Sequence, residues 1–192
     1  MKINEIKPFP IFDDKNAVEE SIPFLQDAKE AFGLIPNVEG VMALAPSLLA
    51  SYMTAWNQFS QTSLTPLEQQ IVYQAANFEN NCEYCMPWHT ILCEQVGLSN
   101  DDVEALRQGS ELSSAKHEAL RVFSRDLVRT QGNIEPNALR KFFDAGFTEQ
   151  HALEVILGLS VKTMSNYTNA IAQTPLDEAA ASKRWKKPTL RA

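Results

Sequence analysis

Residues 65–99 read TPLEQQIVYQAANFENNCEYCMPWHTILCEQVGLS, and this stretch contains the clearest helix signals in the chain. Thr65 is a typical N-cap residue, a proline occupies the next position, and Glu68 completes a capping box three residues after the cap. Apolar residues then recur at helical spacing until two adjacent asparagines interrupt the pattern. A second helix is predicted from about Cys82 to Val96, with a glycine directly after it. The stretch therefore predicts two consecutive helices and no strand.

The remainder of the chain shows the same helical periodicity. Only residues 2–6 suggest a strand, and that piece is short. The sequence therefore predicts an all-α fold, with Thr174 as the cap of a last helix before a basic tail at residues 183–192. Further helices are expected at residues 21–32, 37–44, 46–59, 101–108, 113 or 114 to 130, 135–145 and 151–172. Asn37, Ser99 and Thr148 are the expected N-caps of the second, fourth and last of these.

Length and composition exclude several classes of protein. The chain has 192 residues, a formal net charge of −7 and three cysteines. The acidic balance argues against nucleic-acid binding, and no apolar run is long enough to span a membrane. Residues 1–5 contain no apolar signal core, so we expect a cytoplasmic protein. Three cysteines are too few, and an odd number, for a disulfide framework. Seven scattered glycines disfavour a phosphate-binding loop, and no cofactor motif is present.

The pattern is consistent with one domain over residues 1–192. A motif-bearing core covers about residues 40–108, and a second helical half covers about 113–180. Thr148 follows Thr65 by 83 positions, and the same offset places the cysteine tetrad 82–85 on residues 165–168. A degenerate internal repeat would explain this shared spacing, and so would coincidence; the sequence alone leaves both open.

Residues 82–93 contain the side chains that suggest chemistry. On a helix, Cys82, Cys85, His89 and Cys93 would lie on one face. A cysteine reacts as the thiolate, and a position in the first helical turn lowers the pKa of a thiol. His89 would accept or relay the proton, and a companion thiol three residues away would close a disulfide. The spacing therefore favours a redox-active dithiol.

Other readings of these residues exist. Cys82, Cys85 and His89 would supply three zinc ligands, but one helix face is a poor tetrahedral cage, and no metal site is predicted. Burial of the cysteines as inert core residues is a second alternative, and it is the preferred reading for Cys93. No motif surrounds the other two histidines, so we assign them no site role. They are His117, expected to be exposed, and His151, expected at the surface or in a cap region.

Residues 82–89 form a C-x-x-C-x-x-x-H motif, with further matching segments at residues 64–68 and 97–99. In this region the sequence strongly resembles the carboxymuconolactone decarboxylase/AhpD-like superfamily. It is most similar to the peroxidase-related alkylhydroperoxidase branch of that superfamily. This resemblance implies an AhpD-like helical bundle that forms homo-oligomers as dimers, trimers or hexamers. It also implies that Cys85 is the peroxidatic thiolate, Cys82 the resolving cysteine and His89 part of the proton relay. Outside the motif, the resemblance extends more weakly to residues 166–169 and 174–176.

Two positions depart from the family pattern. The family usually has a glutamate 12 residues before the first cysteine, and this sequence has Gln70, which cannot take a proton at neutral pH. Glu68 lies about 200° away around the helix, so a capping role suits it better. The residue between the cysteines, a histidine in AhpD itself, is Tyr84, which would donate a hydrogen bond or pack as an aromatic.

The resulting prediction is a cofactor-free peroxidase-like oxidoreductase that reduces a small hydroperoxide through a Cys82–Cys85 disulfide cycle. Its reductant would be a dithiol partner, such as a lipoyl-bearing or thioredoxin-like protein. A redox-sensing or ligand-binding oligomer with little turnover is the first alternative, and a carboxymuconolactone-decarboxylase-like lyase is the second. Four aromatic residues would contribute to subunit interfaces or, as the preferred alternative, to core packing: Tyr52, Trp56, Phe59 and Trp185.

Overall fold

The computed structural model describes residues 8–189, and in that part of the chain every regular element is a helix. This confirms the all-α prediction, whereas the possible strand at residues 2–6 lies outside the described residues. Two 3-10 turns, Glu19–Ser21 and Glu178–Lys183, flank the α-helical region. The α-helices are α1 (Ile22–Phe32), α2 (Asn37–Met42), α3 (Pro46–Ser60), α4 (Pro66–Glu79), α5 (Cys85–Gln95), α6 (Asn100–Gln108), α7 (Ala115–Thr130), α8 (Pro136–Asp144) and α9 (Glu149–Ala172).

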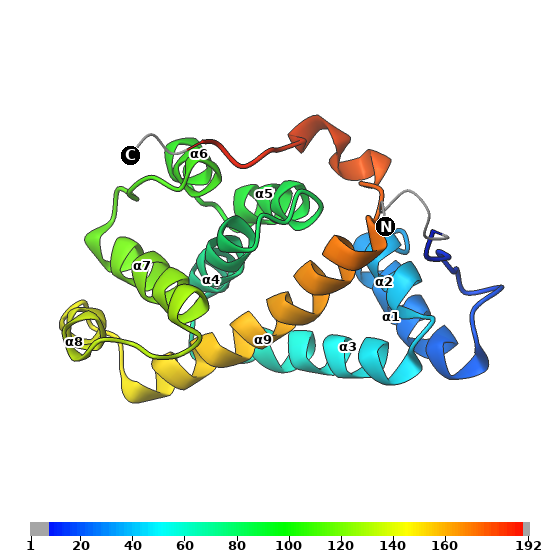
Figure 1. The fold of residues 1–192 in the computed structure, drawn as a ribbon, viewed down its shortest axis with the longest axis horizontal. Coiled ribbons are helices and arrows are strands. Elements are labelled where there is room, and N and C mark those ends of the chain that lie inside the picture. The colour runs from blue at the N-terminus through cyan, green and yellow to red at the C-terminus, as the bar shows by residue number, and fades with distance from the viewer. Residues whose placement is uncertain (1–7, 190–192) are drawn as a thin grey trace, which may run out of the picture.

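Helix α4 is the centre of the bundle and contacts α5, α7 and α9 (Figure 1). Its residues 68–78 are all buried, as expected for a helix that neighbours enclose on every side. The long helix α9 crosses the molecule beside α4 and packs against α3 on its other side. The cysteine helix α5 is therefore held between α4 and the C-terminal segment, near one end of α9.

The helix starts agree with the capping signals in the sequence. Thr65 and Glu68 form the predicted capping box at the start of α4. Thr148 forms a second box with His151 at the start of α9, and Ser99 caps α6. These interactions each satisfy backbone N–H groups that would otherwise lack a partner in the first turn.

Three predicted boundaries are wrong. Helix α5 begins at Cys85, so Cys82 lies in the preceding turn and not on the same helix face. Asn37 is the first helical residue of α2, because Pro36 is its N-cap. Thr174 caps no helix. The last helical turn begins after Asp177, whose carboxylate accepts from the backbone N–H of Asn37 and does not cap that turn.

The internal repeat suggested by the sequence is only partly visible in the helices. Both capping threonines start helices, as the 83-residue offset predicts. The two tetrads differ, however, because residues 82–85 lie where α4 gives way to α5, whereas residues 165–168 lie within the unbroken helix α9.

The C-terminal tail folds back over α5 and α6 (Figure 1). Trp185 is buried against Phe78, and its indole Nε1 donates to the carbonyl of Arg107 at 2.8 Å. Arg107 in turn donates to the carbonyls of Lys183 and Arg184. Trp185 therefore belongs to the core, as do Tyr52 and Phe59, which confirms the packing interpretation for these three residues.

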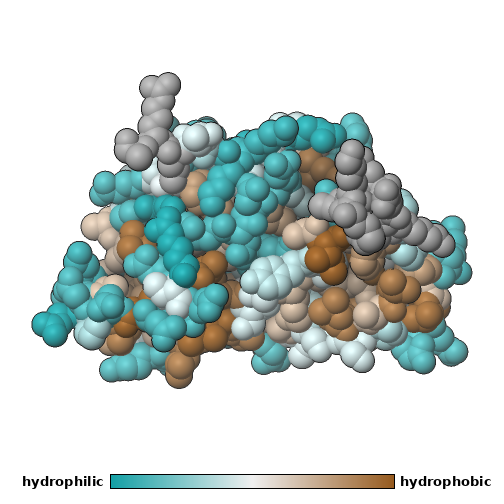
Figure 2. Space-filling view, viewed as in Figure 1, coloured by the Kyte–Doolittle hydropathy of each residue, from teal (hydrophilic) through white to brown (hydrophobic). Residues whose placement is uncertain are grey.

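The outer face of α9 exposes four large apolar side chains, which are between 49% and 70% exposed. At about 100° per residue, their positions fall within about 60° of one another around the helix. Apolar side chains gather toward both ends of the molecular face shown in Figure 2. We call these four residues the α9 stripe: Leu153, Ile156, Tyr167 and Ile171.

None of the helices within residues 8–189 is both long and apolar enough to cross a lipid bilayer.

Gly158 lets α9 approach α3 closely. A Cβ atom at this position would lie 2.6 Å from the ring of Phe59, which is fully buried and packs against Tyr73. The ring therefore has little room to move away. One helical turn further on, the same face of α9 delivers Lys162 to the interior of the bundle.

Replacing Gly158 with alanine is expected to lower the free energy of unfolding by about 1–3 kcal/mol, because overpacking outweighs the gain in helix propensity. Urea unfolding followed by circular dichroism measures the effect. Ser160→Ala, on the exposed side of the same helix, is the control and should stay within about 0.5 kcal/mol of wild type. An alanine variant at 158 as stable as wild type would contradict the close packing.

Candidate functional site

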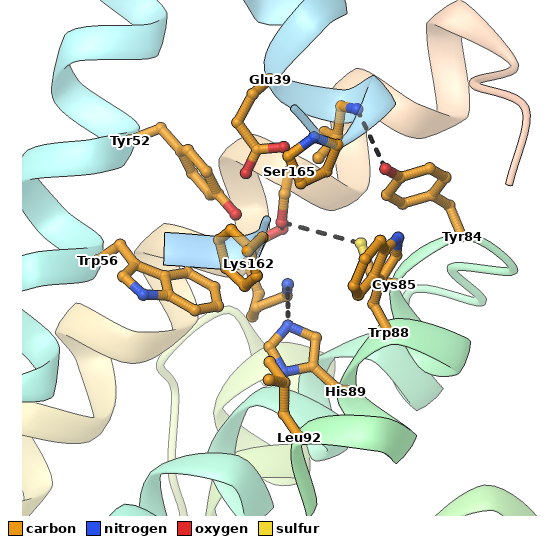
Figure 3. A pocket seen from close by; sticks show the side chains of 13 residues that line it. Glu39, Tyr52, Trp56, Tyr84, Cys85, Trp88, His89, Leu92, Lys162 and Ser165 are labelled. Carbon is orange, nitrogen blue, oxygen red and sulfur yellow. Dashed lines mark hydrogen bonds between the residues drawn. The ribbon is translucent and has the colours of Figure 1, made fainter. Parts of the chain in front are cut away.

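A small cavity of about 30 Å³ lies where α2, α3, α5 and α9 meet (Figure 3). This volume holds one or two water-sized molecules. Half-buried aromatic and aliphatic side chains form its outer rim: Phe32, Trp56, Trp88 and Leu92. Buried polar side chains form its inner wall: Glu39, Tyr52, Tyr84, Cys85, His89, Lys162 and Ser165.

The two cysteines of the motif lie together at the start of α5. Cys85 is the first helical residue, and its backbone N–H donates to the sulfur of Cys82 at 3.1 Å. Both thiols are free and buried. Cys85 lines the cavity, whereas Cys82 lines a separate, larger groove of about 430 Å³ with residues from the end of α9. The structure therefore brings the predicted pair of cysteines together, but the two residues line different spaces.

Two amide side chains from α9 donate to the sulfur of Cys85. The Nδ2 atoms of Asn166 and Asn169 lie 3.1 and 3.2 Å from it. Asn166 is held in place because it also donates to Asn77 and accepts from Asn80, each at 2.9 Å. Amide N–H groups aimed at a sulfur atom favour its anionic form.

These surroundings separate the pKa values of the two thiols. Burial raises the pKa of Cys85, but a hydrogen bond from Cys82, the charge of Lys162 and the two amide donors outweigh it, and the pKa falls well below its ordinary value. Burial and the neighbouring Cys85 raise the pKa of Cys82. These opposite shifts favour the thiolate form of Cys85 and the thiol form of Cys82.

His89 is buried between Gln70 and Lys162. Its Nδ1 lies 2.8 Å from the Oε1 atom of Gln70, and its Nε2 lies 2.8 Å from the Nζ atom of Lys162. The amide oxygen can only accept, so we assign the ring proton to Nδ1, and Nε2 then accepts from the ammonium. Burial and the nearby lysine lower the pKa of His89, which keeps the ring neutral.

Tyr84, between the cysteines, is anchored rather than merely packed. Its hydroxyl donates to Asp177 and accepts from the backbone N–H of Val38. Asp177 also accepts from the indole of Trp88 and from the backbone N–H of Asn37, at 2.9 and 3.1 Å. One carboxylate from the C-terminal segment therefore ties together α2, the cysteine turn and the rim of the cavity.

Glu39, the inward-facing acid of α2, is only 3% exposed, and its Oε2 atom has no hydrogen-bond partner within residues 8–189. Burial raises its pKa to about 8, with nearby Asp177 and Cys85 adding to the rise and Lys162 opposing it. Figure 3 shows the carboxyl group facing the interior near Tyr52.

Several candidates from the sequence lie away from this cavity. Glu68 accepts in the capping box and pairs with Lys116 at 2.7 Å, which confirms its capping role. Cys93 is fully buried, as predicted. His151 belongs to the cap of α9, and His117 is half-buried rather than exposed. Within residues 8–189, no group of three or more metal-ligating side chains is placed to hold an ion.

Sequence reasoning missed the groups that α2, α9 and the C-terminal segment contribute. Lys162 is the sole Lys or Arg in α9, and a lone cation in a helix whose acidic residues all lie in its first two turns was a usable signal. The weak resemblance at residues 166–169 pointed toward Asn166 and Asn169. Nothing in the local sequence marks Glu39 or Asp177, because their roles arise from contacts distant in the chain.

Comparisons with known proteins agree with this architecture. Residues 46–124 match the model of the carboxymuconolactone decarboxylase family. No curated protein sequence matches the chain.

Solved structures share the fold at low sequence identity. A peroxidase-related protein of Ralstonia eutropha JMP134, described as an alkylhydroperoxidase AhpD core, superposes with a TM-score of 0.80 and 14% identity, covering 95% of this chain and 100% of that one. A Cys-to-Ala variant of the debrominase Bmp8 in complex with 2,3,4-tribromopyrrole superposes with a TM-score of 0.78 and 12% identity, covering 93% of this chain and 96% of that one. A peroxidase-related protein of Silicibacter sp. TM1040 superposes with a TM-score of 0.75 and 18% identity, covering 90% of this chain and 91% of that one.

Replacing Lys162 with methionine is expected to raise the pKa of Cys85, because the buried positive charge favours the thiolate. The midpoint of the alkylation rate against pH should move up by about 1–3 pH units. Iodoacetamide labelling of the Cys85 peptide, quantified by mass spectrometry, measures it. Lys141→Met removes an exposed charge on α8 and should leave the midpoint in place. An unchanged midpoint in the Lys162 variant would show that the amide donors suffice.

Proposed function

We propose that this chain, whose residues 46–124 match the carboxymuconolactone decarboxylase family and whose fold is that of AhpD-like proteins, is a thiol-dependent, peroxidase-like oxidoreductase that reduces hydroperoxides through a Cys82–Cys85 disulfide cycle. The observation that carries the proposal is the environment of Cys85. Its sulfur receives two amide hydrogen bonds and the charge of Lys162, and it lines a cavity. A stabilised thiolate beside space for a small molecule suits attack on a peroxide bond.

The cycle has two steps in this proposal. The Cys85 thiolate attacks the terminal oxygen of the hydroperoxide, so that an S–O bond forms, the O–O bond breaks, and an alcohol leaves once its oxygen is protonated. Sulfur is oxidised by two electrons to a sulfenic acid. Cys82 gives up its proton as its sulfur attacks the sulfenic acid; the S–S bond forms, the S–O bond breaks, and the proton leaves with the hydroxyl group as water.

Lys162 and His89 support the thiolate differently from the family pattern. With Gln70 at the usual glutamate position, the carboxamide fixes the tautomer of His89 and takes no proton. His89 instead accepts from Lys162 and so orients the ammonium. We propose that the lysine supplies the positive charge and His89 holds it in place.

The proposed reductant is a dithiol, either a lipoyl group or a thioredoxin-like protein in the cytoplasm. The groove beside Cys82 supports this idea, because it is more than ten times larger than the cavity beside Cys85. Polar side chains line it, including Asn81 and Gln173. A dithiol entering this groove would attack the sulfur of Cys82 and release Cys85.

A redox sensor with little turnover is the second candidate, and Gln70 favours it because the usual acid–base residue is missing. Turnover with dihydrolipoamide separates the two, since a sensor is oxidised once and stops. A lyase gains some support from Lys162, a cation that the cysteine helix itself does not offer. Activity on a lactone acid that survives loss of both motif cysteines would favour that third reading.

Cys85→Ser should abolish rapid peroxide consumption, and Cys82→Ser should stop the cycle after one equivalent. In wild type, tert-butyl hydroperoxide is expected to remove two free thiols per chain, because Cys93 is fully buried with a pKa raised to about 12. Thiol counting and dimedone trapping of the sulfenic acid measure both effects. Cys93→Ala is the matched control and should retain the cycle. Undiminished peroxide loss in Cys85→Ser would refute the assignment.

We also propose that the chain forms a homo-oligomer through the α9 stripe. Two pairs of exposed apolar side chains lie on one face of a long helix, with Ser160 between them, and such apolar surface favours an interface between copies of the chain. Leu153→Glu with Ile171→Glu is expected to shift the mass measured by light scattering to that of a monomer. Val122→Glu, at an exposed apolar residue of α7, should not change the mass. A monomeric wild type would disprove the proposal.

A further inference from the structure

Within residues 8–189, Glu39 is the buried acid with an unpartnered oxygen, alongside an unpartnered amide oxygen of Asn169 and the hydroxyl of Thr174. It reaches the cavity from α2, opposite side chains of α5 and α9 (Figure 3). Its carboxyl group is almost fully buried, and Oε2 has no partner within the described chain. An unpartnered buried carboxyl group is costly, so its retention calls for a functional explanation.

Three other polar side chains of the cavity already have partners. Lys162 donates to His89, and the ring proton of His89 faces Gln70. Tyr84 donates to Asp177. The Tyr52 hydroxyl also lines the cavity, but burial raises its pKa, so Glu39 is the stronger acid of the two.

The charges that face Glu39 keep it protonated near neutral pH. Burial is the largest cause of its raised pKa, about 8, and Asp177 from the C-terminal segment and Cys85 from α5 act in the same direction. Lys162 from α9 opposes them. From α3, the Tyr52 hydroxyl is neutral, since burial raises its pKa as well. A protonated carboxyl group is a hydrogen-bond donor and a competent acid.

We propose that Glu39 is the general acid of the peroxidase reaction. The O–O group of an alkyl hydroperoxide enters the cavity while its alkyl group stays at the apolar rim, and Glu39 donates a hydrogen bond to the carbon-side oxygen and protonates it as the O–O bond breaks. This inference rests on the proposed function. The Cys85 thiolate takes the terminal oxygen with its hydrogen, the alkoxide oxygen takes the proton of Glu39, and the products are a sulfenic acid, an alcohol and the Glu39 carboxylate. When a dithiol later restores Cys85, the carboxylate recovers the proton of its thiol. Charge is balanced over the cycle.

The choice of oxidant tests this role, because a general acid matters only when the leaving group is a strong base. Alkoxide from tert-butyl hydroperoxide needs a proton, whereas acetate from peracetic acid does not. At pH 7, Glu39→Gln is expected to slow oxidation of Cys85 by tert-butyl hydroperoxide by about 100-fold or more. Oxidation by peracetic acid should change less than about threefold, because no proton transfer is lost. Stopped-flow tryptophan fluorescence follows both reactions, and Glu30→Gln, an exposed acid on α1, is the control.

The pH dependence gives an independent readout. In wild type, the rate with tert-butyl hydroperoxide should fall as pH rises through about 8, because Glu39 loses the proton it must donate. Glu39→Gln should lack this fall. If the variant does not fold, a wild-type rate that stays flat from pH 7 to pH 10 overturns the proposal.

The failures of the two proposals are distinguishable. If wild-type Cys85 reacts with tert-butyl hydroperoxide no faster than free cysteine thiolate, the peroxidase function is wrong, and this role falls with it. If wild type reacts rapidly and Glu39→Gln matches it, only the role of Glu39 is overturned. Equal slowing with both oxidants would assign Glu39 a structural role and overturn it too.

Discussion

The buried ammonium of Lys162 is the constraint around which the site is arranged. It is 1% exposed, and it forms no ion pair with a carboxylate in the described chain. Its direct partners are the neutral ring of His89 and the face of Tyr73. A buried charge needs compensation, and the Cys85 thiolate provides it. The cation and the anionic form of Cys85 therefore stabilise each other.

This charge balance also explains the other departures in the site. One cation and one thiolate leave no compensating charge for a second anion, so a protonated Glu39 is the consistent state. An ionised glutamate at position 70 would add a carboxylate beside His89, whereas Gln70 adds only a dipole. The carboxamide therefore fits a site in which the lysine, rather than a carboxylate relay, supplies the electrostatic stabilisation.

Local signals were sufficient for most of the fold, because capping and periodicity act within one helix. Thr65, Thr148 and Ser99 cap helices as predicted. The prediction for the start of α5 was wrong because the sulfur of Cys82 accepts the backbone N–H of Cys85, and the chain turns there. The motif located the dithiol, whereas Glu39 and Asp177 reach the site from distant parts of the chain. Such contacts follow from packing, which no local pattern encodes.

The turn at Cys82 has a consequence for the cycle that a continuous helix would not allow. If both cysteines lay on one helix face, both sulfurs would open to the same space. Because Cys82 precedes α5, its sulfur lines the groove at the end of α9, while Cys85 lines the cavity. Tyr84 borders both spaces, and its bond to Asp177 fixes the wall between them. In the proposed cycle, a small oxidant and a bulky dithiol would reach different sulfurs of one disulfide without competing for one entrance.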